Sequence, residues 1–145
     1  MGGDLGLSPT LATTRRTTDA RKQPFTGWGL TYHADDGLRI ARWLGAGANG
    51  KLDKRLLGAA LQRDPASPGL KAGFANYRYR AGFWARDLAP ELGCTAPRWT
   101  PFLSGFGGIA VVMLRPDATF YTFGDGDHWD WSAPAAPLLR TRACG

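Results

Sequence analysis

The first clear hydrophobic pattern along this chain is helical and lies in residues 33–47. Apolar positions recur there every three or four residues, at Leu38, Ala41 and Trp43 or Leu44. Asp35 or Asp36 can cap the start of the helix, and Gly45 can stop it. The pattern predicts an amphipathic helix whose apolar side must pack on another element.

A second helical pattern follows in residues 52–64. Its apolar positions fall on one side, at Leu52, Leu56 and Ala60 together with Leu57 and Leu61. Asp53 is a suitable cap, and the pattern stops before Pro65, because the residue before a proline disfavours the helical conformation. We therefore predict a second helix here.

The pattern then changes from helical spacing to alternation. Residues 74–88 alternate aromatic and basic side chains and predict a half-buried strand, with Tyr77 and Tyr79 on one face and Arg78 and Arg80 on the other. After a Pro-containing loop at residues 94–101, two apolar runs, "GGIAVVMLRP" and "ATFYTFGDG", predict a hairpin of central antiparallel strands.

These elements predict an α+β fold in which two helices precede an antiparallel sheet of about three strands, with a short C-terminal helix from Ser132. Residues 1–24 lack a sustained hydrophobic period and are expected to be a flexible lead-in to a folded unit at residues 25–145. Helices with one apolar face need the strands as a cover. We expect one shared core of Leu38, Trp43, Leu57, Val111, Val112 and Phe120.

Composition narrows the class of protein. A chain of 145 residues with 43% hydrophobic residues fits one domain, and its net charge of +6 comes from scattered Lys and Arg rather than a basic patch, so no nucleic-acid partner is expected. Cys94 and Cys144 are either two free thiols or one disulfide. No signal peptide and no membrane-spanning segment is evident, and the localisation is unknown.

The chain offers few candidates for chemistry. The turn "SGFGG", residues 104–108, does not open a helix after a strand, which argues against a phosphate-binding loop. His33 and His128 have no partner that would make either of them a catalytic base, and surface or capping positions suit them better. The acidic run "GDGDHWDWS" lacks the ligand spacing of a calcium loop, so no metal site and no cofactor is predicted.

Three segments together resemble a known family. The succession "QPFTGWGLTYHADDGLRIARWL", "GFW" and "PFLSGFGGIAVVMLRPDATFYTF" resembles the C-terminal third of serine hydrolases related to β-lactamases and penicillin-binding proteins, over about residues 22–145. In that family the chain ends with three antiparallel strands and a helix packed on the sheet. The resemblance implies a partial β-lactamase/transpeptidase-like fold and, in a complete protein, hydrolysis of an ester, amide or β-lactam through a seryl intermediate.

The family's catalytic motifs are absent from this chain. It contains neither a Ser-x-x-Lys nor a Tyr-x-Asn or Ser-x-Asn, so no catalytic residue is assigned and the chain alone is expected to be inactive. The family's Lys-Thr-Gly element falls near "WTPFLSGFGG", which has no lysine. The resemblance therefore implies only a substrate-cleft wall, made of Ser104, Gly105, Phe106, Gly107 and Gly108.

Two other functions stay open on the sequence. A non-catalytic binding module could use the basic aromatic segment "NYRYRAGFW" on an anionic or single-stranded partner. A domain kept only for protein interaction could self-associate through an uncovered sheet edge. The glycines of the turn could also serve only to shape a tight strand entry.

Overall fold

The computed structural model describes residues 5–23, 31–63, 68–72, 76–105, 109–115, 118–123, 130–132 and 137. Its helical elements are η2 (Pro9–Thr13), α1 (Ala34–Gly45), η3 (Ala48–Gly50), α2 (Lys54–Ala60) and α3 (Ala89–Leu92). Its strands are β1 (Leu70–Lys71), β2 (Tyr77–Arg80), β3 (Phe83–Asp87), β4 (Trp99–Gly105), β5 (Ile109–Arg115) and β6 (Ala118–Phe123). Helices and strands are thus largely separate along the chain, as in an α+β fold.

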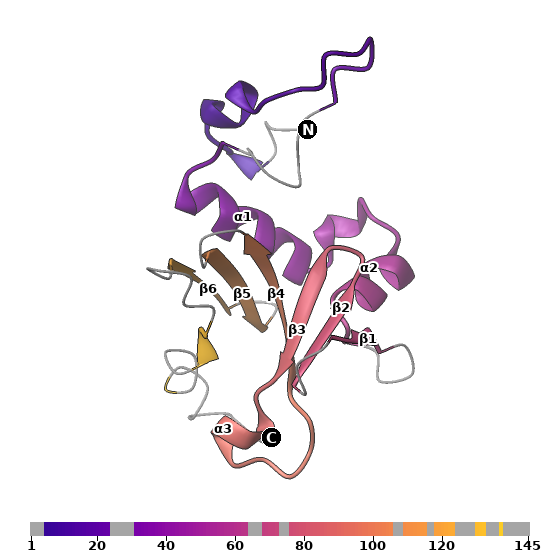
Figure 1. Ribbon diagram of the computed structural model, residues 1–145, viewed down its shortest axis with the longest axis vertical. Helices are drawn as coiled ribbons and strands as arrows, with labels where there is room; N and C mark the ends of the chain where they lie inside the picture. Colours follow the sequence, from indigo (N-terminus) through magenta and orange to yellow (C-terminus); the bar gives the residue numbers. More distant parts are fainter. Residues whose placement is uncertain are drawn as a thin grey trace.

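The strands form one antiparallel meander in which every strand pairs with the next one along the chain. Within the described residues the order across the sheet is β1-β2-β3-β4-β5-β6, and α1 crosses the sheet near one end of β4, β5 and β6 (Figure 1). The α+β class is confirmed. The expected number of about three strands is corrected to six in the part of the chain that the structure describes, where β1 has two residues.

Strand β3 was not predicted as a separate strand, because the alternation of aromatic and basic residues continues across the turn of the β2–β3 hairpin. The expected single strand at residues 74–88 turns back at Ala81 and Gly82, so that Tyr79 pairs with Trp84 across β2 and β3. Both turn residues have positive φ, at 48° and 88°, as in the tight hairpin turns that match strand twist. Alanine rarely adopts this conformation, so the sequence carried only a weak turn signal.

A second missed strand, β4, runs into the segment expected to be a Pro-containing loop. Pro101 lies inside β4 opposite Ala85 of β3, whereas the pairing with β5 begins one residue later, at Phe102 opposite Val112. Proline has no N–H to donate and is therefore uncommon in central strands. Here it stands just outside the β4–β5 ladder, which explains how a strand can include it.

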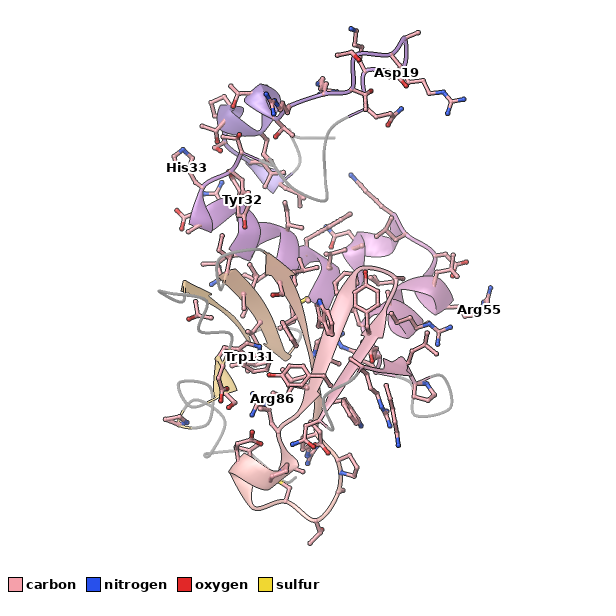
Figure 2. The ribbon with its side chains drawn as sticks, viewed as in Figure 1. Asp19, Tyr32, His33, Arg55, Arg86 and Trp131 are labelled. Atoms are coloured by element: carbon pink, nitrogen blue, oxygen red, sulfur yellow. The ribbon has the colours of Figure 1, made fainter. Side chains whose placement is uncertain are left out.

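The two predicted helices are both present. Asp53 caps α2 by accepting a hydrogen bond from the Leu56 N–H at 2.8 Å, as expected. In α1 the N-cap position belongs to His33, which lies at the start of the helix (Figure 2), and Asp36 reaches back to accept from the His33 N–H at 3.0 Å. The helix ends at Gly45.

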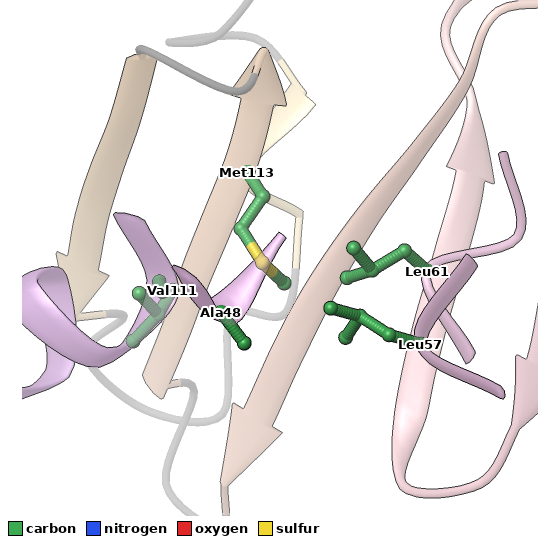
Figure 3. Packing of buried hydrophobic residues seen from close by; sticks show 6 residues of the cluster. Ala48, Leu57, Leu61, Val111 and Met113 are labelled. Carbon is green, nitrogen blue, oxygen red and sulfur yellow. The ribbon is translucent and has the colours of Figure 1, made fainter. Parts of the chain in front are cut away.

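Each face of the sheet has its own hydrophobic core. The helix-side core consists of Ala41, Ala48, Leu57, Leu61, Val111 and Met113, and in Figure 3 Met113 points from β5 toward Leu57 and Leu61. The opposite core consists of Leu88, Phe102, Ala110, Val112 and Trp131. Burial of each large apolar side chain stabilises the fold by roughly 1.5–3 kcal/mol.

The single shared core expected from the sequence is therefore wrong in one respect. Leu57 and Val111 are buried together, with Leu38 and Trp43 packed against them, but Val112 belongs to the opposite core. Successive residues of a strand point to opposite faces, so Val111 and Val112 cannot share one core. The side chain of Phe120 lies outside what the structure describes.

The N-terminal segment is attached to the start of α1. The Asp36 carboxylate, 1% exposed, accepts hydrogen bonds from both the backbone N–H, at 2.8 Å, and the hydroxyl of Ser8. Thr14 is buried and accepts from the Thr31 N–H at 3.2 Å. The mobility expected of residues 1–24 stays a prediction, but these contacts fix where the segment joins the folded unit.

Because these hydrogen bonds favour the ionised carboxylate, they lower the pKa of Asp36, with the Ser8 hydroxyl contributing most. A carboxyl group whose pKa is lowered in the folded state stabilises the protein at pH values above its pKa in the unfolded chain, about 3.9. This stabilisation is lost progressively as the pH falls below that value and through the lower pKa of the folded state. We expect Asp36→Asn to lower the melting temperature at neutral pH, and the difference from wild type to shrink progressively below about pH 4.

Asp35→Asn is the matched control, since this exposed neighbour in the same helical turn makes no comparable bond in the described chain. Thermal unfolding followed by circular dichroism between acidic and neutral pH measures both variants. A pH-independent difference for Asp36→Asn would contradict the role given to its carboxylate.

Candidate functional site

The sequence-predicted cleft wall begins at the end of β4. Ser104 lies opposite Ala110 and Gly105 opposite Ile109, so both residues belong to the last part of the β4–β5 ladder. Phe106, Gly107 and Gly108 connect these two strands and lie outside the described residues. The described part of the candidate site is therefore a strand end in the middle of the sheet.

The side chain of Ser104 is on the face opposite α1. Its neighbour Leu103 packs against the helix-side core, and Ala110, its partner across the ladder, belongs to the opposite core. Ser104 is half-buried, and its hydroxyl makes no hydrogen bond within the described structure. The hydroxyl is thus available to a ligand, but no base is hydrogen-bonded to it that could make it a nucleophile.

An apolar row crosses the same face of the sheet. Register pairing aligns Leu70, Tyr79, Trp84, Phe102 and Val112 on five successive strands. The exposed fraction falls along the row from 80% at Leu70 and 42% at Tyr79 to 4% at Phe102 and 0% at Val112. The β1 end of the row is therefore open to solvent, and the β5 end is core.

Edge-to-face contacts between aromatic rings stabilise the apolar row. The ring centroids of Tyr79 and Trp84 are 5.0 Å apart at 61°, and those of Phe102 and Trp131 are 4.9 Å apart at 65°. Edge-to-face pairs of this kind add about 0.5–1.5 kcal/mol beyond the area they bury. Trp131 thereby fastens the C-terminal segment to the middle of the sheet.

Beside the row, Arg86 of β3 contacts Tyr77 of β2, Glu91 of α3 and Asp130, which is 44 residues away in sequence. Its Nη2 donates to Glu91 Oε1 at 2.6 Å, and its Nη1 donates to Asp130 Oδ1 and to the Tyr77 hydroxyl, each at 2.8 Å. Figure 2 shows Arg86 close to Trp131, the residue after Asp130. We call Tyr77, Arg86, Glu91, Asp130 and Ser132 the arginine cluster.

The opposite charges in the arginine cluster keep Arg86 and Asp130 ionised, because they shift the pKa values of both groups. Desolvation alone would lower the pKa of Arg86, but the bond to Glu91 and the charge of Asp130 outweigh it and raise that pKa. Desolvation would likewise raise the pKa of Asp130, but hydrogen bonds from the Ser132 hydroxyl and N–H, together with Arg86, lower it. Arg86 therefore stays charged, and its guanidinium is engaged in hydrogen bonds with Tyr77, Glu91 and Asp130.

The basic residues of β2 lie on the other face of the sheet, as the alternation predicted. The Arg78 guanidinium lies 3.8 Å from the centroid of the Trp99 ring, a cation–π contact, and Arg80 donates to the Pro68 carbonyl oxygen. Tyr77 and Tyr79 share their face with Trp84. Aromatic and basic side chains of this strand thus do not converge on one surface.

Cys94, just after α3, is disulfide-bonded. Of the two alternatives left open by the sequence, the structure therefore supports the disulfide. Cys144, the only other cysteine of the chain, lies outside the described residues. A disulfide of this kind persists in an oxidising environment.

The described ranges contain neither a metal-binding cluster nor a helix that could span a membrane. No group of three His, Cys, Asp or Glu side chains that could hold a metal ion occurs among these residues. None of the helices described is long and apolar enough to cross a membrane. His128 and most of the acidic run around it fall outside the described residues.

Comparison with known proteins gives no relative for this chain. No family model, no curated protein and no solved structure matches it. The functional argument therefore depends on the residues and geometry of the chain itself.

Removal of Arg86 should break the arginine cluster. Arg86→Gln leaves Glu91 and the Tyr77 hydroxyl without their partner in a site where the arginine side chain is only 12% exposed. We expect the free energy of unfolding to fall by about 2–4 kcal/mol. Arg55→Gln, on the exposed side of α2, should change it by less than about 0.5 kcal/mol. Urea denaturation measures both, and equal small effects would contradict the structural role of the cluster.

Proposed function

We propose that this chain is the C-terminal part of a β-lactamase-related serine hydrolase and contributes one wall of its substrate cleft. The observation that carries the proposal is the position of Ser104: a half-buried, unpartnered hydroxyl at the end of a central antiparallel strand, directly before the glycine-rich connection. The family's Lys-Thr-Gly element falls at this point of the sequence. Strands β4, β5 and β6, with α1 across the sheet, are consistent with the C-terminal strands expected from the resemblance.

In this proposal the chain positions the substrate and does not attack it. The serine nucleophile and the lysine that takes its proton come from an upstream part of the protein, because the chain has no Ser-x-x-Lys. The Ser104 hydroxyl hydrogen-bonds the substrate, and the Gly105 N–H faces the carbonyl oxygen on which negative charge develops. Glycine at the following positions lets the backbone approach the substrate closely.

The substrate is a small molecule with an ester, amide or β-lactam carbonyl, and the reaction needs no metal and no cofactor. A nucleic-acid partner is not part of the proposal, since stacking on aromatic rings is normally combined with cations facing the same strand. Here Arg78 stacks on Trp99 on one face, and Tyr79 and Trp84 lie on the other.

The alternative is a non-catalytic binding module, and one observation favours it. Leu70 and Tyr79 are both exposed at the β1 end of the apolar row, where a partner could cover them. Because β1 is a two-residue edge strand, a second copy could also add to this edge and produce self-association. Size-exclusion chromatography with light scattering distinguishes a dimer, disrupted by Leu70→Lys, from a monomer that this substitution leaves unchanged.

The hydrolase proposal first predicts that the 145-residue chain alone has no hydrolytic activity. A chromogenic ester or a β-lactam should be hydrolysed no faster than in buffer, because the nucleophile and its base are missing. A fluorophosphonate probe followed by mass spectrometry should label no serine of the chain. Stoichiometric labelling of any of these serines would contradict the assignment of Ser104 as a wall residue.

The second prediction concerns the protein extended by its upstream coding sequence. Hydrolysis should then appear, and Ser104→Ala should lower kcat/KM by about 10- to 100-fold through the loss of one hydrogen bond to the transition state. Thr122→Ala is the matched control, since Thr122 lies in the same row of the same face, beyond Ala110. It should change kcat/KM by less than about twofold.

The melting temperatures of these two variants separate catalysis from folding. Ser104→Ala should leave the melting temperature within about 2 °C of wild type, because the hydroxyl makes no hydrogen bond to a described residue that the substitution would remove. Equal losses of activity and stability would indicate that the turn only shapes the entry to β5. If Ser104→Ala kept the activity of the wild-type protein, the assignment of Ser104 to the substrate cleft would be wrong.

A further inference from the structure

A pocket of about 420 Å³ lies where the loop after α1 meets α2. Gly47 and Gly50 line it from the loop, Lys54 and Gly58 from α2, and Arg63 from the segment after α2. Its volume is within the range of sites that bind small molecules. Neither the arginine cluster nor Ser104 contributes to it.

Glycine forms much of the wall. A Cβ atom added at Gly47, Gly50 or Gly58 would meet no other atom within 4 Å, so no side chain fills this space. The floor is apolar and is made by Leu57 and Leu61, which belong to the helix-side core. The pocket is therefore open above a rigid apolar base.

The loop wall is held in an uncommon backbone conformation. Four consecutive residues, Gly47, Ala48, Asn49 and Gly50, have φ values of 89°, 54°, 50° and 71°. Two of them are not glycine, and Ala48 is fully buried, so the left-handed backbone is imposed by the surrounding structure. Strained backbone of this kind concentrates at sites that bind ligands, where it fixes the shape of the wall in advance.

The charge of the pocket is positive. The Arg63 side chain donates from its Nη1 to the Gly45 carbonyl oxygen at 2.7 Å, and desolvation at this position lowers the pKa of Arg63. Among the described residues no carboxylate pairs with Arg63 or with Lys54. Asp53, the residue before Lys54, is engaged in capping α2, and Asp64, the residue after Arg63, lies outside the described residues. Two cations that have no carboxylate partner in the described part of the chain thus border an apolar space.

We propose that this pocket binds a small amphipathic anion, with a phosphate or carboxylate head between Lys54 and Arg63 and a short apolar body on Leu57 and Leu61. A phosphate or carboxylate forms charge-assisted hydrogen bonds with ammonium and guanidinium groups. The apolar body covers the floor, and the glycine walls leave room for it. This site is independent of the proposed hydrolase cleft.

The test is an NMR titration of the 145-residue chain with octyl phosphate, octanoate, 1-octanol and inorganic phosphate, all below micellar concentrations. Octyl phosphate or octanoate should shift the amide signals of Gly47, Gly50 and Gly58 in a saturable way. Octanol, which lacks the charge, and inorganic phosphate, which lacks the apolar body, should each bind about tenfold more weakly or not at all.

Variants locate the site. Lys54→Gln should weaken binding about fivefold or more, whereas Arg55→Gln, the neighbouring cation that points away from α2 in Figure 2, should change it by less than about twofold. A Cβ atom added at Gly58 meets no other atom within 4 Å, so we expect the side chain of Gly58→Leu to occupy the pocket. This variant should abolish binding while the melting temperature is maintained or raised, since leucine suits a helix better than glycine.

Three results would overturn the proposal. The absence of saturable shifts with both amphipathic anions means that there is no such site. If octanol binds as tightly as octyl phosphate, or if Lys54→Gln and Arg55→Gln weaken binding equally, the pocket does not recognise the negative charge and the proposal is wrong. Unchanged binding in Gly58→Leu places the ligand elsewhere on the protein.

Discussion

Strand β5 is buried on both of its faces, and the rest of the structure depends on this constraint. Val111 and Met113 point into the helix-side core, and Ala110 and Val112 point into the opposite core. A strand of this kind needs a cover on each side, because neither apolar face can be left in water. α1 and α2 cover one face, and the segment that carries Trp131 covers part of the other.

The two covers give the two faces different properties. The helix-side face is closed by elements that are close in sequence, and the pocket bordered by Lys54 and Arg63 forms where two of them meet. In the described part of the chain, Trp131 packs into the core of the opposite face, and the arginine cluster holds Asp130 beside it. Ser104 lies on this second face, at a strand end, and its hydroxyl has no hydrogen-bond partner among the described residues. The position of the candidate cleft wall thus follows from the alternation that fixes β5.

Much of this arrangement could be predicted from local patterns, and what was missed depended on contacts that are distant in sequence. α1, α2 and the β5–β6 hairpin follow from periodicity, caps and a proline turn. The β2–β3 hairpin was missed because Ala81 takes the left-handed conformation usually left to Asn, Asp or Gly, and β4 was missed because Pro101 lies within it.

Of the sites described above, the sequence indicated only the cleft wall at residues 104–108, of which Ser104 and Gly105 are described by the structure. No pattern marked the arginine cluster, because Asp130 is 44 residues from Arg86. The pocket beside α2 was also invisible, since it is defined by missing side chains at Gly47, Gly50 and Gly58 and by two cations that no motif connects. Packing in three dimensions, rather than residue order, creates both features.

The central claim is that Ser104 belongs to the wall of an acyl-transfer cleft whose nucleophile lies upstream of this chain. The most direct measurement is the nucleotide sequence that precedes the Met1 codon in the same reading frame. The account predicts an open frame that encodes a Ser-x-x-Lys and, after it, a Tyr-x-Asn or Ser-x-Asn. An in-frame stop codon directly upstream, with neither motif between it and Met1, would contradict it.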